Sequence, residues 1–175
     1  MLSTGKLISE SRAIVMLGRV RDEFRSAVGV YEQSALACSA CQTPGACCLD
    51  AHFVNVRISR LEAVAIRNAL DALANGEREI VLRKVAAAIE RHGLDAGSNR
   101  TYACPLYDRT NGCLVHDIGK PLPCIHHACY ERKEDLPPDE LLDDAELAVE
   151  RLNLRVYGRP MPLLPLPIAI QKVLT

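Results

Sequence analysis

Hydrophobic residues recur every three or four positions across residues 9–36, and this spacing predicts one long amphipathic helix. The apolar positions are Ala13, Leu17, Val20, Phe24, Val28, Tyr31 and Ala35. Charged residues fall on the opposite face, at Arg12, Arg19, Asp22, Glu23 and Arg25. We expect the apolar stripe to face the core. A contact with a protein partner along this helix is the alternative.

A capping box predicts the start of a second helix, over residues 60–74. The Ser59 side chain can accept a hydrogen bond from the backbone N–H of Glu62, while the Glu62 side chain reaches back to Ser59. Asn75 and Gly76 are expected to end this helix, because both residue types tolerate the left-handed cap conformation.

Two more helices follow the same kind of periodicity. One spans residues 77–92 and is expected to end at Gly93. The other begins after a pair of prolines, with Asp139 or Asp135 as its N-cap, and ends at Gly158.

Short β elements are predicted between the helices. Residues 52–58 alternate in polarity and are rich in β-branched side chains, which predicts a strand. Asn111-Gly112 is a strong turn signal between two short apolar stretches, which predicts a small hairpin. Residues 37–50 and the stretch that begins at Pro121 are expected to be loops.

These elements together predict a mainly α fold, with about four helices, a short strand and a small β-hairpin, whose loops are tied by a cysteine-ligated metal site. We expect a single metal-binding domain over residues 1–158, with its cysteine-cluster core at about 36–130. A Pro-rich C-terminal tail, residues 159–175, is expected to be extended and then to form a short turn of helix. The tail is a second candidate for contact with a protein partner.

Composition and charge exclude several classes of protein. The chain has 175 residues, of which 49% are hydrophobic and 25% are charged, so it can bury a core and is not of the disordered class. A net charge of −1 gives no basic surplus for nucleic acid. No run reaches the ~18 apolar residues of a membrane-spanning helix. No signal peptide is visible, so we expect a cytoplasmic protein.

Cysteine is the unusual component of this sequence, because there are eight cysteines and no tryptophan. They fall into two groups: Cys38, Cys41, Cys47 and Cys48, then Cys104, Cys113, Cys124 and Cys129. In a reducing compartment such clusters more often bind metal or do redox chemistry than form disulfides. All eight are therefore candidate metal ligands.

The spacing within the groups indicates what they could hold. Cys38 and Cys41 form a chelating C-x-x-C pair. Cys47 and Cys48 are adjacent, and neighbouring side chains in an extended backbone diverge, so a single plain zinc finger is a poor fit. Four cysteines suffice for one zinc ion or one four-iron cluster, and eight could supply two sites.

Three histidines near the second group are further candidates. His116 follows Cys113 by three residues, and His126 and His127 lie between Cys124 and Cys129. Each could be a nitrogen ligand or a hydrogen-bond partner of a ligand. The chain has no phosphate-binding Gly-rich loop, G-x-S-x-G or H-E-x-x-H motif, so catalytic residues are unknown and enzyme activity is undecided.

The order of these motifs resembles the YkgJ-like cysteine-cluster family, also described as the CxxCxxCC or zinc- or iron-chelating domain. The matching stretches are Cys38-Ser-Ala-Cys41, Cys47-Cys48, the strand ending at Ile58, the Ser59/Glu62 helix start, Cys104-Pro-Leu-Tyr107, Gly112-Cys-Leu-Val-His116 and Lys120-Pro-Leu-Pro-Cys-Ile125. The resemblance covers roughly residues 36–130. Lys120 stands where the family has arginine, and Ile125 replaces the arginine after the last motif cysteine.

The resemblance implies a metal-binding domain, with family positions at Cys38, Cys41, Cys47, Cys48, Cys104, Cys113 and Cys124. Cys129 matches the family less closely. Some relatives in this family are linked to protein methylation and carry an iron–sulfur cluster, which implies that kind of cofactor here.

The cofactor is therefore expected to be a 4Fe–4S iron–sulfur cluster or zinc, with a structural, redox or sensing role. An all-cysteine donor set and the adjacent pair favour a cluster, whereas zinc is the commoner metal at structural four-cysteine sites. Two alternatives remain: an enzyme or enzyme accessory of methyltransferase or oxidoreductase type that uses the site, and a metal-free thiol scaffold or interaction module.

Overall fold

The computed structural model describes residues 6–36, 42–49, 55–130 and 132–174. Its described residues are mainly helical, with seven α-helices and six two-residue strands. The expected mainly α class is therefore confirmed, although the helices outnumber the four expected from sequence. The chain groups into two compact units. Unit 1 comprises residues 1–44 and 121–161, and unit 2 comprises residues 45–120 and 162–175.

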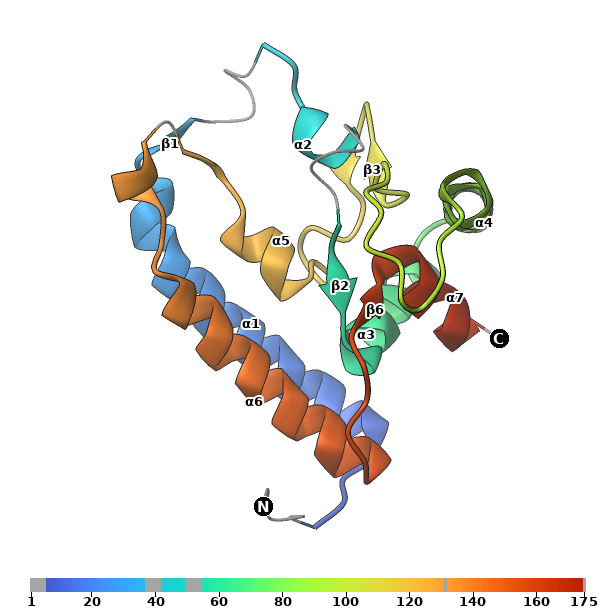
Figure 1. The fold of residues 1–175 in the computed structure, drawn as a ribbon. Helices are drawn as coiled ribbons and strands as arrows, with labels where there is room; N and C mark the ends of the chain where they lie inside the picture. The colour runs from blue at the N-terminus through green and yellow to red at the C-terminus, as the bar shows by residue number, and fades with distance from the viewer. Residues whose placement is uncertain (1–5, 37–41, 50–54, 131, 175) are drawn as a thin grey trace. The chain divides into compact units, whose positions relative to one another are not determined.

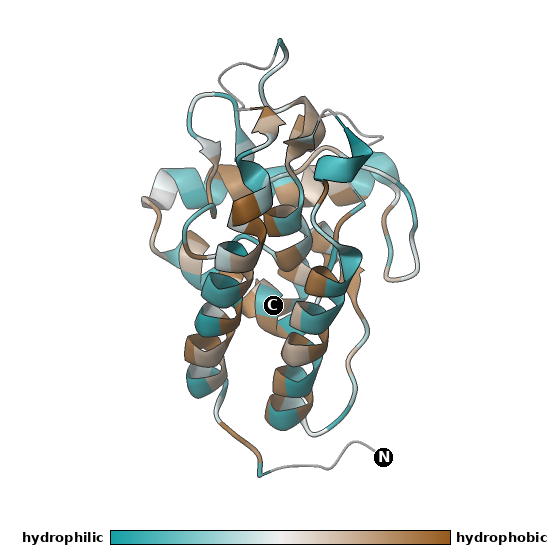
Figure 2. Ribbon diagram, turned by 90° about the vertical axis from the view of Figure 1, so that its left-hand side faces the viewer, coloured by the Kyte–Doolittle hydropathy of each residue, from teal (hydrophilic) through white to brown (hydrophobic). Residues whose placement is uncertain are grey.

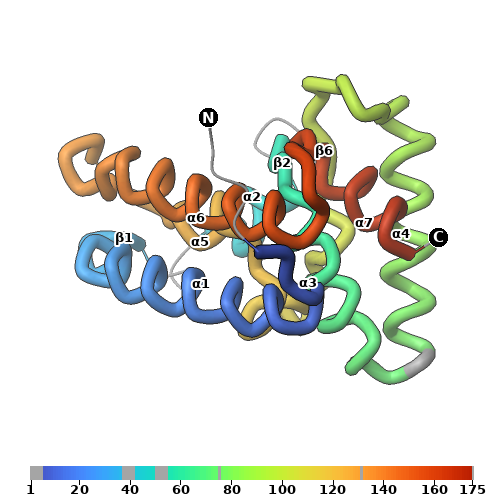
Figure 3. The backbone as a smooth tube through the Cα atoms, turned by 90° about the horizontal axis from the view of Figure 1, so that it is seen from below, coloured from blue at the N-terminus to red at the C-terminus, as the bar shows by residue number. Residues whose placement is uncertain are grey.

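Unit 1 is built on two long antiparallel helices that lie side by side (Figures 1 and 3). They are α1 (Glu10–Glu32) and α6 (Asp139–Tyr157), and the short helix α5 (Leu122–His126) contacts both. Strands β1 (Ala35–Leu36) and β5 (Cys129–Tyr130) pair antiparallel in the same unit. A 3-10 helix, η2 (Lys133–Asp135), precedes α6.

The amphipathic pattern explains how α1 packs. Its buried positions follow the predicted stripe at Ala13, Leu17, Phe24 and Val28, with Arg21 also buried. Along α6 the buried apolar residues are Ala145, Val149 and Leu152. Figure 2 shows hydrophilic and hydrophobic residues alternating along both helices. Their apolar stripes therefore supply the core of unit 1.

Contacts at one end of the α1–α6 pair fasten the two helices. The Tyr157 hydroxyl donates to Glu10 Oε2 at 3.0 Å, and the Ile8 N–H donates to the Arg155 carbonyl at 3.0 Å. The start of α1 is therefore held against the end of α6.

Unit 2 is built on its three longer helices, α3 (Arg60–Asp71), α4 (Asn75–His92) and α7 (Leu166–Leu174), of which α7 contacts both others. Strands β2 (Arg57–Ile58) and β6 (Leu164–Pro165) pair antiparallel ahead of α3 and α7. The remaining elements are the short helix α2 (Ala46–Leu49) and the hairpin of β3 (Tyr107–Asp108) and β4 (Gly112–Cys113).

The last helix completes the core of unit 2. Residues 166–170 of α7 are all buried, and Ile66, Leu70, Val81 and Val85 belong to the same hydrophobic cluster. The helical end of the predicted tail is thus an internal packing element, and it is longer than the single turn expected from sequence.

Tyr102 joins distant parts of this core with its hydroxyl group. The side chain is fully buried, its Oη donates to the Val56 carbonyl at 2.7 Å, and it accepts from the Leu166 N–H at 3.2 Å. The Leu166 N–H also reaches the Val56 carbonyl, at 2.9 Å. One phenol therefore ties the segment before β2 to the start of α7.

Several sequence predictions are confirmed. The capping box forms, with the Glu62 N–H donating to Ser59 Oγ at 3.3 Å and the Ser59 N–H donating to Glu62 Oε2 at 2.9 Å. Helices α4 and α6 end before Gly93 and Gly158. The predicted hairpin forms, with Asn111 in its turn and Gly112 as the first residue of β4.

Other predictions are wrong. Asn75 and Gly76 do not cap a preceding helix: α3 ends at Asp71, and Asn75-Gly76 form the first turn of α4. Neither Asp135 nor Asp139 caps α6, because Pro138 holds that position.

The two expected loops also contain helices. Helix α2 lies within residues 37–50, and α5 lies in the stretch after Pro121. The expected strand 52–58 is observed as β2 alone, and residues 52–54 lie outside the described residues. Within the described part of the chain, no helix is both long enough and apolar enough to cross a membrane.

Replacing Tyr102 with phenylalanine tests the link between the two segments. Loss of the hydroxyl leaves the buried Leu166 N–H and the partly buried Val56 carbonyl with fewer partners, so we expect the free energy of unfolding to fall by about 1–3 kcal/mol. Urea denaturation measures the change, with Tyr31→Phe in α1 as the matched control. An equal, small effect of both substitutions would contradict this role of Tyr102.

Candidate metal centre

Cys47 and Cys48 lie together in α2, a helix that begins directly after Gly45. Gly45 has φ +79°, and its carbonyl accepts hydrogen bonds from the N–H groups of Cys48 and Leu49 at 2.9 and 3.0 Å. Successive helical residues differ by about 100° in direction rather than by the half turn of an extended chain. The thiols of Cys47 and Cys48 are accordingly close enough to hydrogen-bond each other.

Cys104 joins α2 through its backbone. The Cys104 N–H donates to the Cys48 carbonyl at 2.7 Å, which holds the chain just before β3 against α2. The hairpin then returns, and Cys113 in β4 pairs with Tyr107 in β3. Two segments far apart in the sequence thus bring together the thiols of unit 2.

Electrostatic interactions connect these four thiols. Burial is the largest cause that raises the pKa of Cys48 from 9.0 to about 12, followed by Cys104, Cys47 and Cys113. Burial likewise raises the pKa of Cys104 to about 12, with Cys113 and Cys47 adding to the effect. The pKa of Cys113 is also raised, again mainly by burial. The cluster therefore resists negative charge unless a cation compensates for it.

Backbone N–H groups point at two of the sulfurs. Those of Leu106 and Tyr107 hydrogen-bond to Cys104 and lower its pKa against the effect of burial, and that of Val115 does the same for Cys113. In both cases one donor lies two residues after the cysteine. Hydrogen bonds to the sulfur stabilise a thiolate and tune metal–thiolate sites.

The donor set suits a soft metal, since four thiols could ligate one zinc ion or one iron–sulfur cluster. Among the residues that the structure describes, however, no three Cys, His, Asp or Glu side chains are already arranged to hold a metal ion. Cys47, Cys48, Cys104 and Cys113 are free thiols. Binding would require proton loss together with a closer approach of these sulfurs.

The other four cysteines predicted as ligands are Cys38, Cys41, Cys124 and Cys129. Cys124 lies in α5 and Cys129 in β5, both in unit 1, whereas the four thiols described above belong to unit 2. Cys38 and Cys41 lie outside the described residues.

The three histidines occupy different environments. His116 follows β4 and is exposed, and His127 is exposed at the end of α5. The His126 ring stacks on Phe24, with centroids 6.2 Å apart and planes 8° from parallel. Its buried Nε2 has no hydrogen-bond partner within the described residues, so this nitrogen is available to a ligand.

Sequence analysis did not identify the residue that covers α2. A Cβ atom placed on Gly45 would overlap the phenol ring of Tyr107. Tyr107 is thus packed directly over the turn that positions Cys47 and Cys48. The Pro44-Gly45 dipeptide marked the turn, but no pattern in the sequence indicated its partner.

Comparisons with family models, curated proteins and solved structures found no match to this chain. The resemblance to the YkgJ-like family therefore stays a prediction.

Substituting Gly45 tests how the turn is built. Gly45→Ala should destabilise the protein by more than the ~1–2 kcal/mol of a left-handed backbone alone, because the new methyl group also collides with Tyr107. Tyr107→Ala removes the ring that the methyl group would meet. Gly45→Ala should therefore lower the free energy of unfolding less in the Tyr107→Ala background than in the wild-type protein. Purely additive effects in the double-mutant cycle would contradict the close contact.

The buried thiols predict a pH dependence for the metal-free protein. Because the folded-state pKa values of Cys48 and Cys104 exceed those of the unfolded chain, their stabilising contribution is complete below about pH 9 and is lost as the pH rises towards 12. The slope is at most about 1.4 kcal/mol per pH unit for each thiol.

Denaturation curves recorded between those pH values measure the slope. In the Cys48→Ala, Cys104→Ala double variant we expect a shallower decline, while other titrating groups contribute equally to both proteins. Identical slopes for the two proteins would contradict the burial of these thiols.

Proposed function

We propose that this protein binds zinc or a 4Fe–4S cluster through Cys47, Cys48, Cys104 and Cys113. The observation that carries the proposal is the gathering of four interacting, partly buried thiols from two distant segments of unit 2. Scattered core cysteines would not be expected to converge in this way.

The local structure supports thiolate ligation. Backbone N–H groups already reach the sulfurs of Cys104 and Cys113, and Lys120 lowers the pKa of Cys113. These groups would stabilise bound thiolates, while the cation would remove the mutual repulsion of the four sulfurs. An all-sulfur donor set selects zinc or iron–sulfur chemistry over harder cations.

A structural role follows most directly from the position of the site. The four ligands come from α2, the segment before β3, and β4, so a bound metal would fix all three together. Metal binding at such a site contributes to folding free energy, because the unfolded chain does not preorganise the ligands. We place this protein in the cytoplasm, where thiols stay reduced.

Purification without oxygen, followed by elemental analysis, tests the proposal. The wild-type chain should carry stoichiometric zinc or, if it is brown, iron and sulfide. Cys47→Ser with Cys48→Ser should lose that metal, because two of the four donors are removed. Ala46→Ser is the matched control, since it alters α2 but keeps every thiol.

The outcomes separate the alternatives. A folded wild-type protein that stays metal-free after anaerobic reconstitution would contradict the proposal and favour a thiol scaffold. Full metal content in the double serine variant would contradict the assignment of these ligands.

A further inference from the structure

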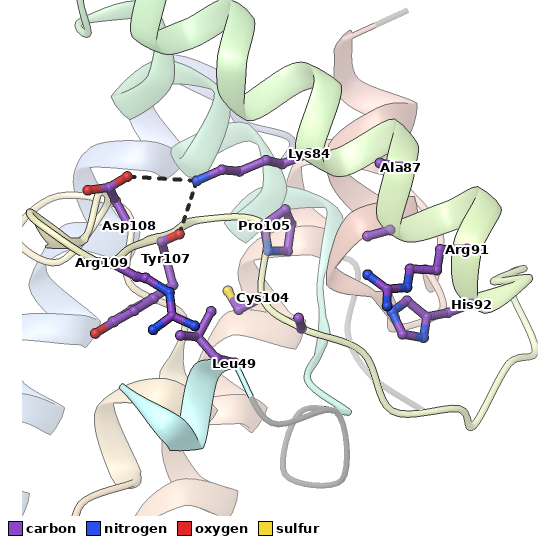
Figure 4. Close-up of a pocket in the computed structure, with 12 residues that line it drawn as sticks. Leu49, Lys84, Ala87, Arg91, His92, Cys104, Pro105, Tyr107, Asp108 and Arg109 are labelled. Carbon is purple, nitrogen blue, oxygen red and sulfur yellow. Dashed lines mark hydrogen bonds and ion pairs between the residues drawn. The ribbon is translucent and has the colours of Figure 1, made fainter. Parts of the chain in front are cut away.

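A cavity of about 450 Å³ lies beside the thiol cluster in unit 2 (Figure 4). It is bounded by one face of α4, the chain over residues 103–109, and Leu49 of α2. This volume is within the range of small-molecule sites. The apolar walls and the charged side chains of the cavity indicate which class of ligand it could bind.

The walls are mostly apolar. Side chains without charge line most of the cavity: Leu49, Ala87, Ala88, Ala103, Cys104, Pro105 and Tyr107. Such a surface suits a ligand with a hydrocarbon body.

The charged groups at the cavity are predominantly cationic. Among the described residues that line the cavity, Asp108 is the only acidic one. Backbone N–H groups of Asn111 and Thr110 hold its pKa low, and its Oδ2 lies 3.8 Å from Lys84 Nζ. Lys84 also donates to the Tyr107 carbonyl at 3.3 Å. Lys84 and Asp108 therefore largely satisfy each other.

Two arginines are left without such partners. Arg91 in α4 and Arg109 after β3 are exposed, and neither side chain has an ion pair or hydrogen bond within the described residues. Their guanidinium groups are therefore available to carboxylate or phosphate oxygens, which they match geometrically.

Figure 4 shows how these arginines are placed. Arg109 lies on one side of Cys104 and Pro105, next to Leu49, and Arg91 lies on the other side, next to His92. An apolar surface with a cationic group at each side favours an elongated ligand with an anionic group at each end.

We propose that this cavity binds a linear organic dianion, with a short apolar chain between two oxyanion groups. Arg91 binds one terminal group and Arg109 the other, while Pro105 and the alanines of α4 contact the chain. Cys104 borders the cavity, but no other described residue of its lining is a proposed metal ligand, so this inference does not rest on the metal site.

Calorimetric titration of the whole chain tests the inference. The probes are adipate and suberate, the alkane bisphosphonates of matching length, and hexanoate as the singly charged control. We expect at least one dianion to bind at least tenfold more tightly than hexanoate. The dicarboxylate and bisphosphonate arms show which oxyanion the arginines prefer.

Substitutions identify the binding groups. Arg91→Gln and Arg109→Gln should each weaken dianion binding about tenfold or more, whereas Arg83→Gln, which removes an exposed charge from the same helix outside the cavity, should not. Hexanoate binding equal to that of every dianion, no measurable binding, or an equal loss in Arg83→Gln would overturn the inference.

Two cross-checks keep this test separate from that of the metal site. Dianion binding should persist in the Cys47→Ser, Cys48→Ser variant, and metal content should persist in Arg91→Gln with Arg109→Gln. Loss of dianion binding in the first variant would overturn the independence of the cavity.

Discussion

The candidate site depends on one backbone hydrogen bond, from the Cys104 N–H to the Cys48 carbonyl at 2.7 Å. It fixes the chain ahead of the β3–β4 hairpin against the four-residue helix α2. A helix this short has little stability of its own. It relies on the Gly45 turn, on Tyr107 packed over that turn, and on this contact with Cys104. The same three features bring the four thiols together.

The thiol cluster is a compromise between burial and charge. Without a cation, burial and mutual repulsion keep Cys48 and Cys104 protonated, so they behave as small apolar side chains. With a cation, the same burial strengthens thiolate–metal attraction, because little water competes for either partner. The backbone N–H groups that hydrogen-bond to Cys104 and Cys113 stabilise the thiolate form of each cysteine more than its neutral thiol form.

Local patterns predicted the parts of the fold that depend on local physics. Periodicity located α1, α4 and α6, the Ser59/Glu62 capping box located the start of α3, and Asn111-Gly112 located the hairpin. Asn75-Gly76 was misassigned because both residues also fit a helix N-terminus, and the turn between α3 and α4 contains no glycine or proline.

The pairing of β1 with β5 and of β2 with β6 joins distant segments, which no local pattern encodes. For the same reason the sequence grouped Cys104, Cys113, Cys124 and Cys129, whereas the structure places the first two and the last two in different units. The side chains of Cys47 and Cys48 were expected to diverge because an extended backbone was assumed. The two residues instead lie in helix α2, so this expectation does not apply.

X-ray absorption spectroscopy at the metal edge tests the central claim most directly. The sample is a variant in which serine replaces Cys38, Cys41, Cys124 and Cys129, so that only the four thiols of unit 2 remain. The account predicts bound zinc or iron with a shell of sulfur neighbours only, at about 2.3 Å, and, for a cluster, additional iron neighbours. A variant that folds but binds no metal, or a shell that contains oxygen or nitrogen in place of sulfur, would contradict the account.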